Sequence, residues 1–227
     1  MTFPPFFLVL LLLAGSGAIS SCSSRHDTDE HEQEVHAGAK SKPAPVAAPP
    51  ALGDTLRLLA QQLDTVRRLG CWDEDFARLM SVHHGGAQRL AAVEVAQGQD
   101  STLRALAQHV LKGHERDNHV LTLALTRQPP AGQEYRPGND RDPFVRRITA
   151  ALAPLRQPPP LPGTLDADFA TLMQVHHQTG VALAQTELAF GKDAEVRNAA
   201  RQIVRDEQAE IKQYQRWLKT HAATPIH

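Results

Sequence analysis

The sequence predicts an all-α protein, because apolar residues recur at helical spacing and no stretch shows the sustained period of two that is typical of strands. The segment DFARLMSVHH at residues 75–84 returns as DFATLMQVHH at residues 168–177, 93 positions later and identical at eight of ten positions. Each copy belongs to a helical hairpin with one apolar stripe per helix, and neither hairpin can bury its stripe alone. The sequence therefore predicts a four-helix bundle made of two repeated helical hairpins, with short covering helices.

The individual helices follow from apolar spacing and from the turn residues between them. Asp73 or Asp75 can cap the first long helix, and Asp100 or Ser101 can cap the helix after it. Proline-rich and glycine-rich segments separate the two halves and precede the second long hairpin. The expected helices span residues 52–70, 73–97, 101–126, 143–155, 166–190 and 194–221.

The N-terminal residues have the pattern of an export signal. Residues 6–14 are an apolar run too short to span a bilayer, and small residues then lead to Ile-Ser-Ser-Cys22. This resembles a bacterial lipoprotein signal over residues 1–21, in which Cys22 is lipidated. The resemblance implies an exported protein, lipid-anchored in the bacterial cell envelope, either in the periplasm or on the outer surface. The alternative is an ordinary cleaved secretory signal with an incidental cysteine, which also implies export.

The remaining chain divides into a tether and a folded part. Residues 22–50 are first acidic and histidine-bearing and then rich in alanine and proline, so they bury too little apolar surface to fold. The bundle is expected at residues 51–221, with the first repeat at 73–126 and the second at 166–220. A formal charge of -1 and 5% aromatic residues give no basis for nucleic-acid binding, and the oligomeric state is left open.

Charged and imidazole side chains occupy positions where the core of the bundle is expected. His83 and His176 lie in the apolar stripes of the first helix of each hairpin, and His84 and His177 lie at the edge of these stripes. The second helix of each hairpin places a polar pair, at i and i+3, in the middle of its own stripe. Such residues are costly in a core unless they are paired or bind a metal. The predicted metal ligands are His83, His114, Asp117, His176, Glu207 and Glu210, with His84, His177, Met80 and Met173 as a second tier.

These residues are expected at similar heights along the bundle. His83 and His114 lie about equally far from the turn at Gly98, and the second repeat has the same spacing about Gly191. A pseudo-twofold axis along the bundle would place all six predicted ligands in one layer. An axis perpendicular to the bundle could split them into two sites of three residues, and the sequence leaves this open.

The start D-F-x-x-x-M-x-x-H-H, the Gly-x-Asp turns and the ending EIKQYQRWL at residues 210–218 resemble the Domain of Unknown Function 305 family. The resemblance implies an exported, ferritin-like four-helix bundle, and some members of the family are associated with copper. Those members tend to be rich in methionine along these helices, whereas this chain keeps only Met80 and Met173. Loss of the soft thioether ligands favours Cu(II), Zn(II) or iron over Cu(I).

Three functions are compatible with this pattern. The leading hypothesis is a metal-binding protein for sequestration or tolerance in the envelope, tethered to the membrane through Cys22. A second is a di-metal oxidase or ferroxidase-like enzyme, although no nucleophile or substrate pocket is evident and catalysis is the less favoured reading. A third is a structural or interaction bundle whose buried His83–Asp117 and His176–Glu207 pairs satisfy one another without metal.

Overall fold

The structure is a computed structural model that describes residues 52–126 and 132–221. The predicted signal sequence with Cys22 and the predicted tether with its histidines lie outside the described residues. The described residues form helices and no strands, which confirms the all-α prediction. The helices are α1 (Leu52–Thr65), α2 (Trp72–Gln97), α3 (Ser101–Thr126), α4 (Pro143–Arg156), α5 (Leu165–Phe190) and α6 (Ala194–His221).

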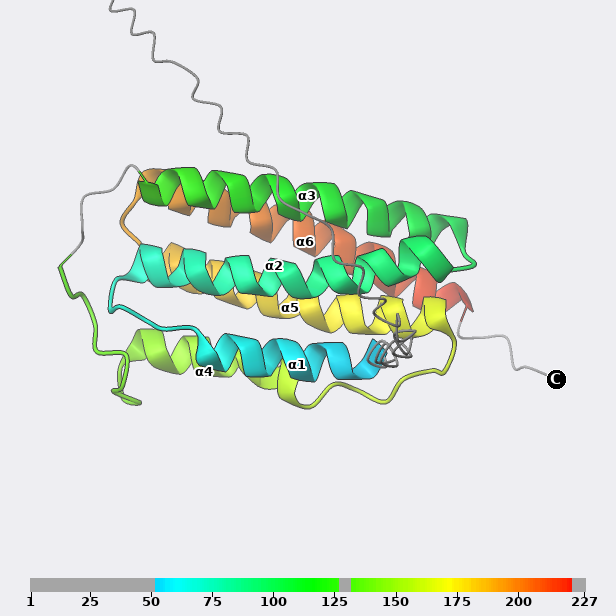
Figure 1. The fold of residues 1–227 in the computed structure, drawn as a ribbon, viewed down its shortest axis with the longest axis horizontal. Helices are drawn as coiled ribbons and strands as arrows, with labels where there is room; N and C mark the ends of the chain where they lie inside the picture. The colour runs from blue at the N-terminus through cyan, green and yellow to red at the C-terminus, as the bar shows by residue number, and fades with distance from the viewer. Residues whose placement is uncertain (1–51, 127–131, 222–227) are drawn as a thin grey trace, which may run out of the picture. The chain divides into compact units, whose positions relative to one another are not determined.

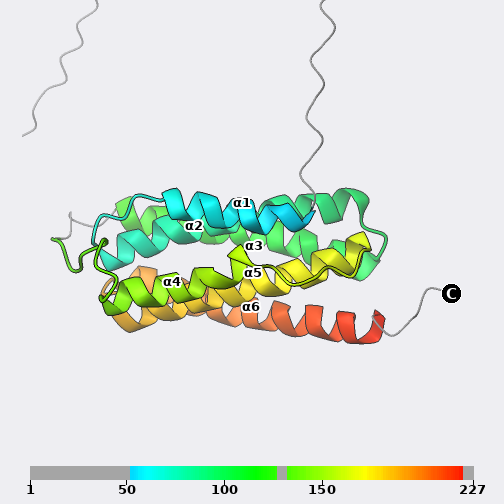
Figure 2. The ribbon, with the colours of Figure 1, turned by 90° about the horizontal axis from the view of Figure 1, so that it is seen from below.

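The helices lie roughly parallel or antiparallel to one another in three pairs (Figure 1). α3 and α6 form one outer pair, α2 and α5 the middle pair, and the shorter α1 and α4 the other outer pair. Seen from below, α1 to α3 occupy one half of the molecule and α4 to α6 the other (Figure 2). Each repeat is therefore a three-helix unit, because the covering helices α1 and α4 correspond to each other as the long helices do.

Many of the buried residues belong to the middle pair, α2 and α5. Phe76, Leu79 and Met80 of α2 are fully buried, as are their counterparts in α5. Gly86 lets α1 approach α2 closely, since a Cβ at this position would overlap the side chain of Leu59. Burial of such apolar surface between the halves is the main force that joins them.

Aspartates at the starts of α2 and α5 each cap a turn of the opposite repeat. Asp73 at the start of α2 accepts hydrogen bonds from the backbone N–H groups of Lys192 and Asp193, at 2.9–3.1 Å. Asp166 at the start of α5 accepts in the same way from Gln99 and Asp100, at 2.9 and 3.0 Å. The start of α2 thus lies beside the end of α5, so the two middle helices are antiparallel.

Some predicted helix boundaries and caps were wrong. α1 ends at Thr65 rather than near Gly70, and α2 begins after Cys71, whose side chain makes no cap hydrogen bond. Asp73 caps the other repeat, as described above, and does not cap its own helix. Asp75 instead accepts from the N–H groups of Leu69 and Gly70 and from the hydroxyl of Tyr135. The prediction that Asp100 caps α3 is confirmed by its bonds from the N–H groups of Thr102 and Leu103.

A buried glutamate lies under each of these turns. Glu94 lies close to Asp166 and Glu187 lies close to Asp73, so each end of the molecule brings together carboxyl groups of both repeats. A Cβ at Gly98 or Gly191 would overlap these glutamate carboxyl groups, which explains glycine at both turns. Burial raises the pKa of Glu94 to about 8 and that of Glu187 to about 9.

Among the described residues, no helix has both the length and the apolar character needed to cross a bilayer.

Candidate metal centre

The centre of the molecule is a reciprocal pair of histidines from the two repeats. The rings of His83 on α2 and His176 on α5 stack with centroids 3.7 Å apart. His83 Nε2 donates to the carbonyl oxygen of His176 at 3.1 Å, and His176 Nε2 donates to the carbonyl oxygen of His83 at 2.9 Å. Because a carbonyl only accepts, both rings carry their proton on Nε2 and leave Nδ1 with a lone pair.

This pair fixes the symmetry of the site. α2 and α5 are antiparallel, so the pseudo-twofold axis runs between the two histidines and across the helices. Both histidines lie near the middle of their helices, and the polar residues of α3 and α6 therefore meet at the same height. The perpendicular axis does not separate the predicted ligands into distant groups of three.

His84 and His114 face each other beside this pair. Their rings stack with centroids 4.2 Å apart, and His84 Nδ1 donates to Asn118 Oδ1 at 2.8 Å. His84 Nε2 and His114 Nε2 are buried and have no hydrogen-bond partner among the described residues. Each of these two rings thus presents an unused nitrogen to the interior.

His177 has a different environment in the second repeat. Its Nε2 lies 2.6 Å from Glu210 Oε2. Its Nδ1 lies 3.4 Å from Nδ1 of His176. Glu210 also faces the exposed His109, whose Nε2 is 3.8 Å from Glu210 Oε1.

Glu207 completes the cluster from α6. Its side chain is 2% exposed, and neither carboxyl oxygen has a hydrogen-bond partner among the described residues. A Cβ at Gly180 would overlap this carboxyl group, so glycine at this position makes the room that Glu207 occupies. The equivalent position in the first repeat is Ala87, which faces no such carboxylate because His114 replaces the glutamate.

Burial shifts the pKa values of the candidate ligands toward their neutral forms. Burial, together with the neighbouring imidazoles, holds the pKa of His83, His114 and His176 well below the usual range, and burial lowers that of His84 to about 4. Burial, followed by the charges of Glu210 and Asp117, raises the pKa of Glu207 well above its ordinary value. Burial also raises the pKa of Asp117, which Arg116 partly opposes.

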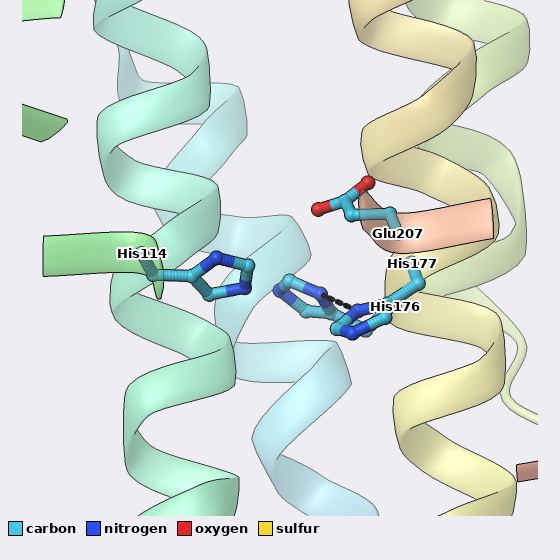
Figure 3. A group of neighbouring side chains, drawn as sticks. All are labelled: His114, His176, His177 and Glu207. Carbon is cyan, nitrogen blue, oxygen red and sulfur yellow. Dashed lines mark hydrogen bonds between the residues drawn. The ribbon is translucent and has the colours of Figure 1, made fainter. Parts of the chain in front are cut away.

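The donor atoms gather into three overlapping groups, and within each group they lie within 4.8 Å of one another. Figure 3 shows the fullest of these groups, in which the imidazoles of α3 and α5 point toward one another and the carboxyl group of α6 lies beside them. The groups are His114, His176, His177 and Glu207; His83, His84 and Glu207; and His84, His114 and Asp117.

Asp117 connects the cluster to the surface. It is 8% exposed and lines, with Arg116 and residues of α6, an open groove of about 440 Å³ between α3 and α6. Arg116 contacts both Asp117 and Asp206 at this groove, at 3.4 and 3.5 Å.

The family follows from a comparison of the sequence with protein-family models. The model described as Domain of unknown function (DUF305) matches residues 73–218, which is more than half of the chain. The chain belongs to the DUF305 family. No curated protein matches it.

Two solved structures resemble this DUF305 protein. A DUF305 fragment from Deinococcus radiodurans is 27% identical, with a TM-score of 0.48, and the match covers 66% of this chain and 96% of the fragment. A structure described as CopM in the Cu(I)-bound form is 24% identical, with a TM-score of 0.48, and the match covers 65% of this chain and 96% of that one.

All six predicted ligands of this DUF305 protein are buried near the centre, but their surroundings differ. Glu210 contacts His177, and Asp117 lies at the groove. The second-tier residues His84 and His177 are fully buried and belong to the donor groups, although their positions at the stripe edge indicated a lesser role. Met80 and Met173 are also fully buried, one turn before the central histidines.

Two contributing residues were missed by the sequence reasoning. Asn118 orients His84, and Gly180 makes space for Glu207. Comparison of the repeats carries a signal for both, since their counterparts 93 positions away are Ile211 and Ala87. Asn118 lies one turn after His114, and Gly180 lies against Glu207. Both differences therefore adjoin the position at which one repeat has histidine and the other has glutamate.

Proposed function

We propose that this protein is an exported metal-binding protein that sequesters a transition-metal ion in the bacterial cell envelope. The observation that carries the proposal is the convergence of buried imidazole nitrogens and the Glu207 oxygens without hydrogen-bond partners. Each unsatisfied buried polar group costs about 1–3 kcal/mol, and a bound ion would recover this cost. Neutral imidazoles and a carboxylate are ligands that suit Cu(II), Zn(II) or iron.

The primary site of the proposal consists of His114, His176, His177 and Glu207. The Nδ1 atoms of His176 and His177 lie 3.4 Å apart. These two atoms share a hydrogen bond, whose proton an ion would displace. Two nitrogens bound to one tetrahedral ion, at about 2.0–2.1 Å each, lie about 3.3 Å apart, which matches the observed separation.

The residues around these ligands have the role of orienting partners. Carbonyl and carboxylate groups fix which nitrogen of each ring is protonated, as is common for histidines that bind metals. The carbonyl of His83 does this for His176, and Glu210 does it for His177. Lipidation of Cys22 would hold the protein at the membrane, and this part of the proposal rests on the N-terminal sequence alone.

Metal analysis of protein purified without a histidine tag tests the proposal. His26, His31 and His36 are replaced by asparagine in every protein compared, because these tail histidines can bind metal independently. We expect one or more ions per chain and a higher unfolding midpoint with Cu(II), Zn(II) or Fe(II). At a metal concentration 100 times Kd, the gain is about 2.7 kcal/mol. Protein that binds none of these ions and is stabilised by none would overturn the proposal.

The variant His114→Leu separates metal binding from a structural network. It removes an unsatisfied buried nitrogen, so we expect the metal-free protein to keep or gain stability, by on the order of 1 kcal/mol. The same change should weaken metal binding at least tenfold. His119→Leu, at an exposed position of the same helix, is the matched control and should leave metal binding unchanged. A structural network predicts a loss of stability without metal.

A further inference from the structure

A second set of donors lies next to the primary site and shares one residue with it. His83 and His84 form their own group with Glu207, separate from the three histidines of the primary site. All three side chains are buried, with exposed fractions of 0 to 2%. Glu207 thus belongs to two donor groups.

The two additional histidines are already oriented as ligands. Nε2 of His83 donates a hydrogen bond to the carbonyl oxygen of His176, and Nδ1 of His84 donates one to Oδ1 of Asn118. The opposite nitrogens, His83 Nδ1 and His84 Nε2, are buried and have no hydrogen-bond partner among the described residues. No partner within the described protein uses these lone pairs, so a ligand is needed to satisfy them.

A carboxylate can join two ions because its two oxygens can each bind one. Both oxygens of Glu207 lack hydrogen-bond partners, and Gly180 lets the group sit close to α5. Two ions that share ligands lie about 3.5–4 Å apart and repel each other. The negative carboxylate between them offsets part of this repulsion, and Asp117 is also close to His84 and His114.

We propose that the core binds two ions bridged by Glu207, the first on His114, His176 and His177 and the second on His83 and His84. This inference rests on the proposed function and deepens it. The first ion has four protein ligands and is closed. The second has three, so it keeps an open coordination position that water or another small ligand can fill.

Dialysis of the full chain against Co(II) tests the inference, again with the three tail histidines replaced by asparagine. Bound cobalt is counted by elemental analysis, and coupling between the ions is measured by magnetic susceptibility. We expect two coupled Co(II) ions per chain. Binding of no ion would overturn the proposed function as well, whereas binding of a single ion would overturn only the two-ion inference.

Variants locate the second ion. His84→Gln should reduce the count from two ions to one and keep the ion of the primary site. Asn118→Ile introduces the residue found at the equivalent position 211 of the second repeat. It should weaken binding of the second ion about 10- to 100-fold, because His84 loses the partner that orients its ring. Glu207→Gln should abolish the coupling between ions. His119→Gln is the control and should keep two ions. Two coupled ions in both His84→Gln and Asn118→Ile would overturn the assignment.

Discussion

At the residue scale, the candidate site depends on a glycine that leaves room for Glu207 as much as on the residues that could bind an ion. The Glu207 carboxyl group lies where a side chain at position 180 would begin, and glycine is the residue that leaves this volume empty. A closely packed interior has little room to relax around an added methyl group. The position of Glu207, and with it both proposed ions, therefore depends on a residue that has no ligand atom.

Replacing Gly180 with alanine should displace Glu207. We expect the unfolding free energy to fall by about 1–3 kcal/mol from overpacking. Affinity for the first metal ion should fall at least tenfold in equilibrium dialysis. The control is Gly113→Ala on α3, where the nearest atom to the new Cβ is Arg116 Nη2 at 3.9 Å. The unfolding free energy of this control should rise by up to about 1 kcal/mol, because alanine favours a helix more than glycine does. Unchanged metal affinity in Gly180→Ala would contradict the role assigned to this glycine.

The sequence identified the buried polar residues but not their hydrogen-bond partners. Helical periodicity fixes the direction in which a side chain leaves its helix, so the inward positions of His83, His114 and Glu207 could be predicted. Hydrogen-bond partners depend on the height and rotation of neighbouring helices, which periodicity does not give. The pairs His83–Asp117 and His176–Glu207, which the structural alternative requires, are absent among the described hydrogen bonds, and carbonyl groups bind both histidines instead.

At the element scale, the ends of the helices join the two repeats. Asp73 and Asp166 each cap the turn of the other repeat, and a glutamate beneath each turn lies close to the same aspartate. Sequence reasoning assigned Asp73 to the nearest helix start, because capping rules consider only neighbours along the chain. The elements themselves were predicted to within a few residues, since proline, glycine and aspartate mark most of their ends.

The two glutamates should make the protein less stable in alkaline solution. In the folded state they hold a proton up to about pH 8 for Glu94 and about pH 9 for Glu187, whereas the unfolded carboxyl groups release it near pH 4.5. Folding thus takes up protons in this range, and the unfolding free energy falls as the pH rises. We expect the unfolding free energy to fall by on the order of 1 kcal/mol per pH unit per glutamate as the pH rises from 6 to 8 in urea unfolding.

A double change of Glu94→Gln and Glu187→Gln should remove most of this alkaline slope, because the amide resembles the protonated carboxyl group and does not titrate. Glu115→Gln, at an exposed position of α3, changes the same chemical group and should leave the slope as it is. An equal slope in the double variant and the unaltered protein would show that other groups cause it.

At the scale of the whole molecule, the buried histidines link stability to acid. In the folded state burial holds the pKa of His84 at about 4 and those of His83, His114 and His176 well below the usual range. The unfolded chain binds protons on these residues below about pH 6.5, so the unfolding free energy falls as the pH drops below this value.

For the metal-free protein we expect a loss on the order of 1 kcal/mol per pH unit per histidine as the pH falls from 6.5 to 4. Urea unfolding in the presence of a chelator measures it. Added metal should raise the unfolding free energy at pH 7. This gain should disappear in the same acidic range, because the ligands must be deprotonated to bind the ion. His84→Gln should lessen the slope, whereas His119→Gln should not. Constant stability over this range would contradict neutral buried histidines.

The fusion of the two repeats into one chain has a consequence for how such a centre can arise. A symmetric homodimer of single repeats would carry the same residue at both related positions, either two histidines or two glutamates. A single chain is free of that restriction, and here His114 stands opposite Glu207, with Asn118 opposite Ile211 and Ala87 opposite Gly180. Duplication thus allows one repeat to supply a third histidine at the position where the other supplies a carboxylate, within a framework that neither repeat can complete alone.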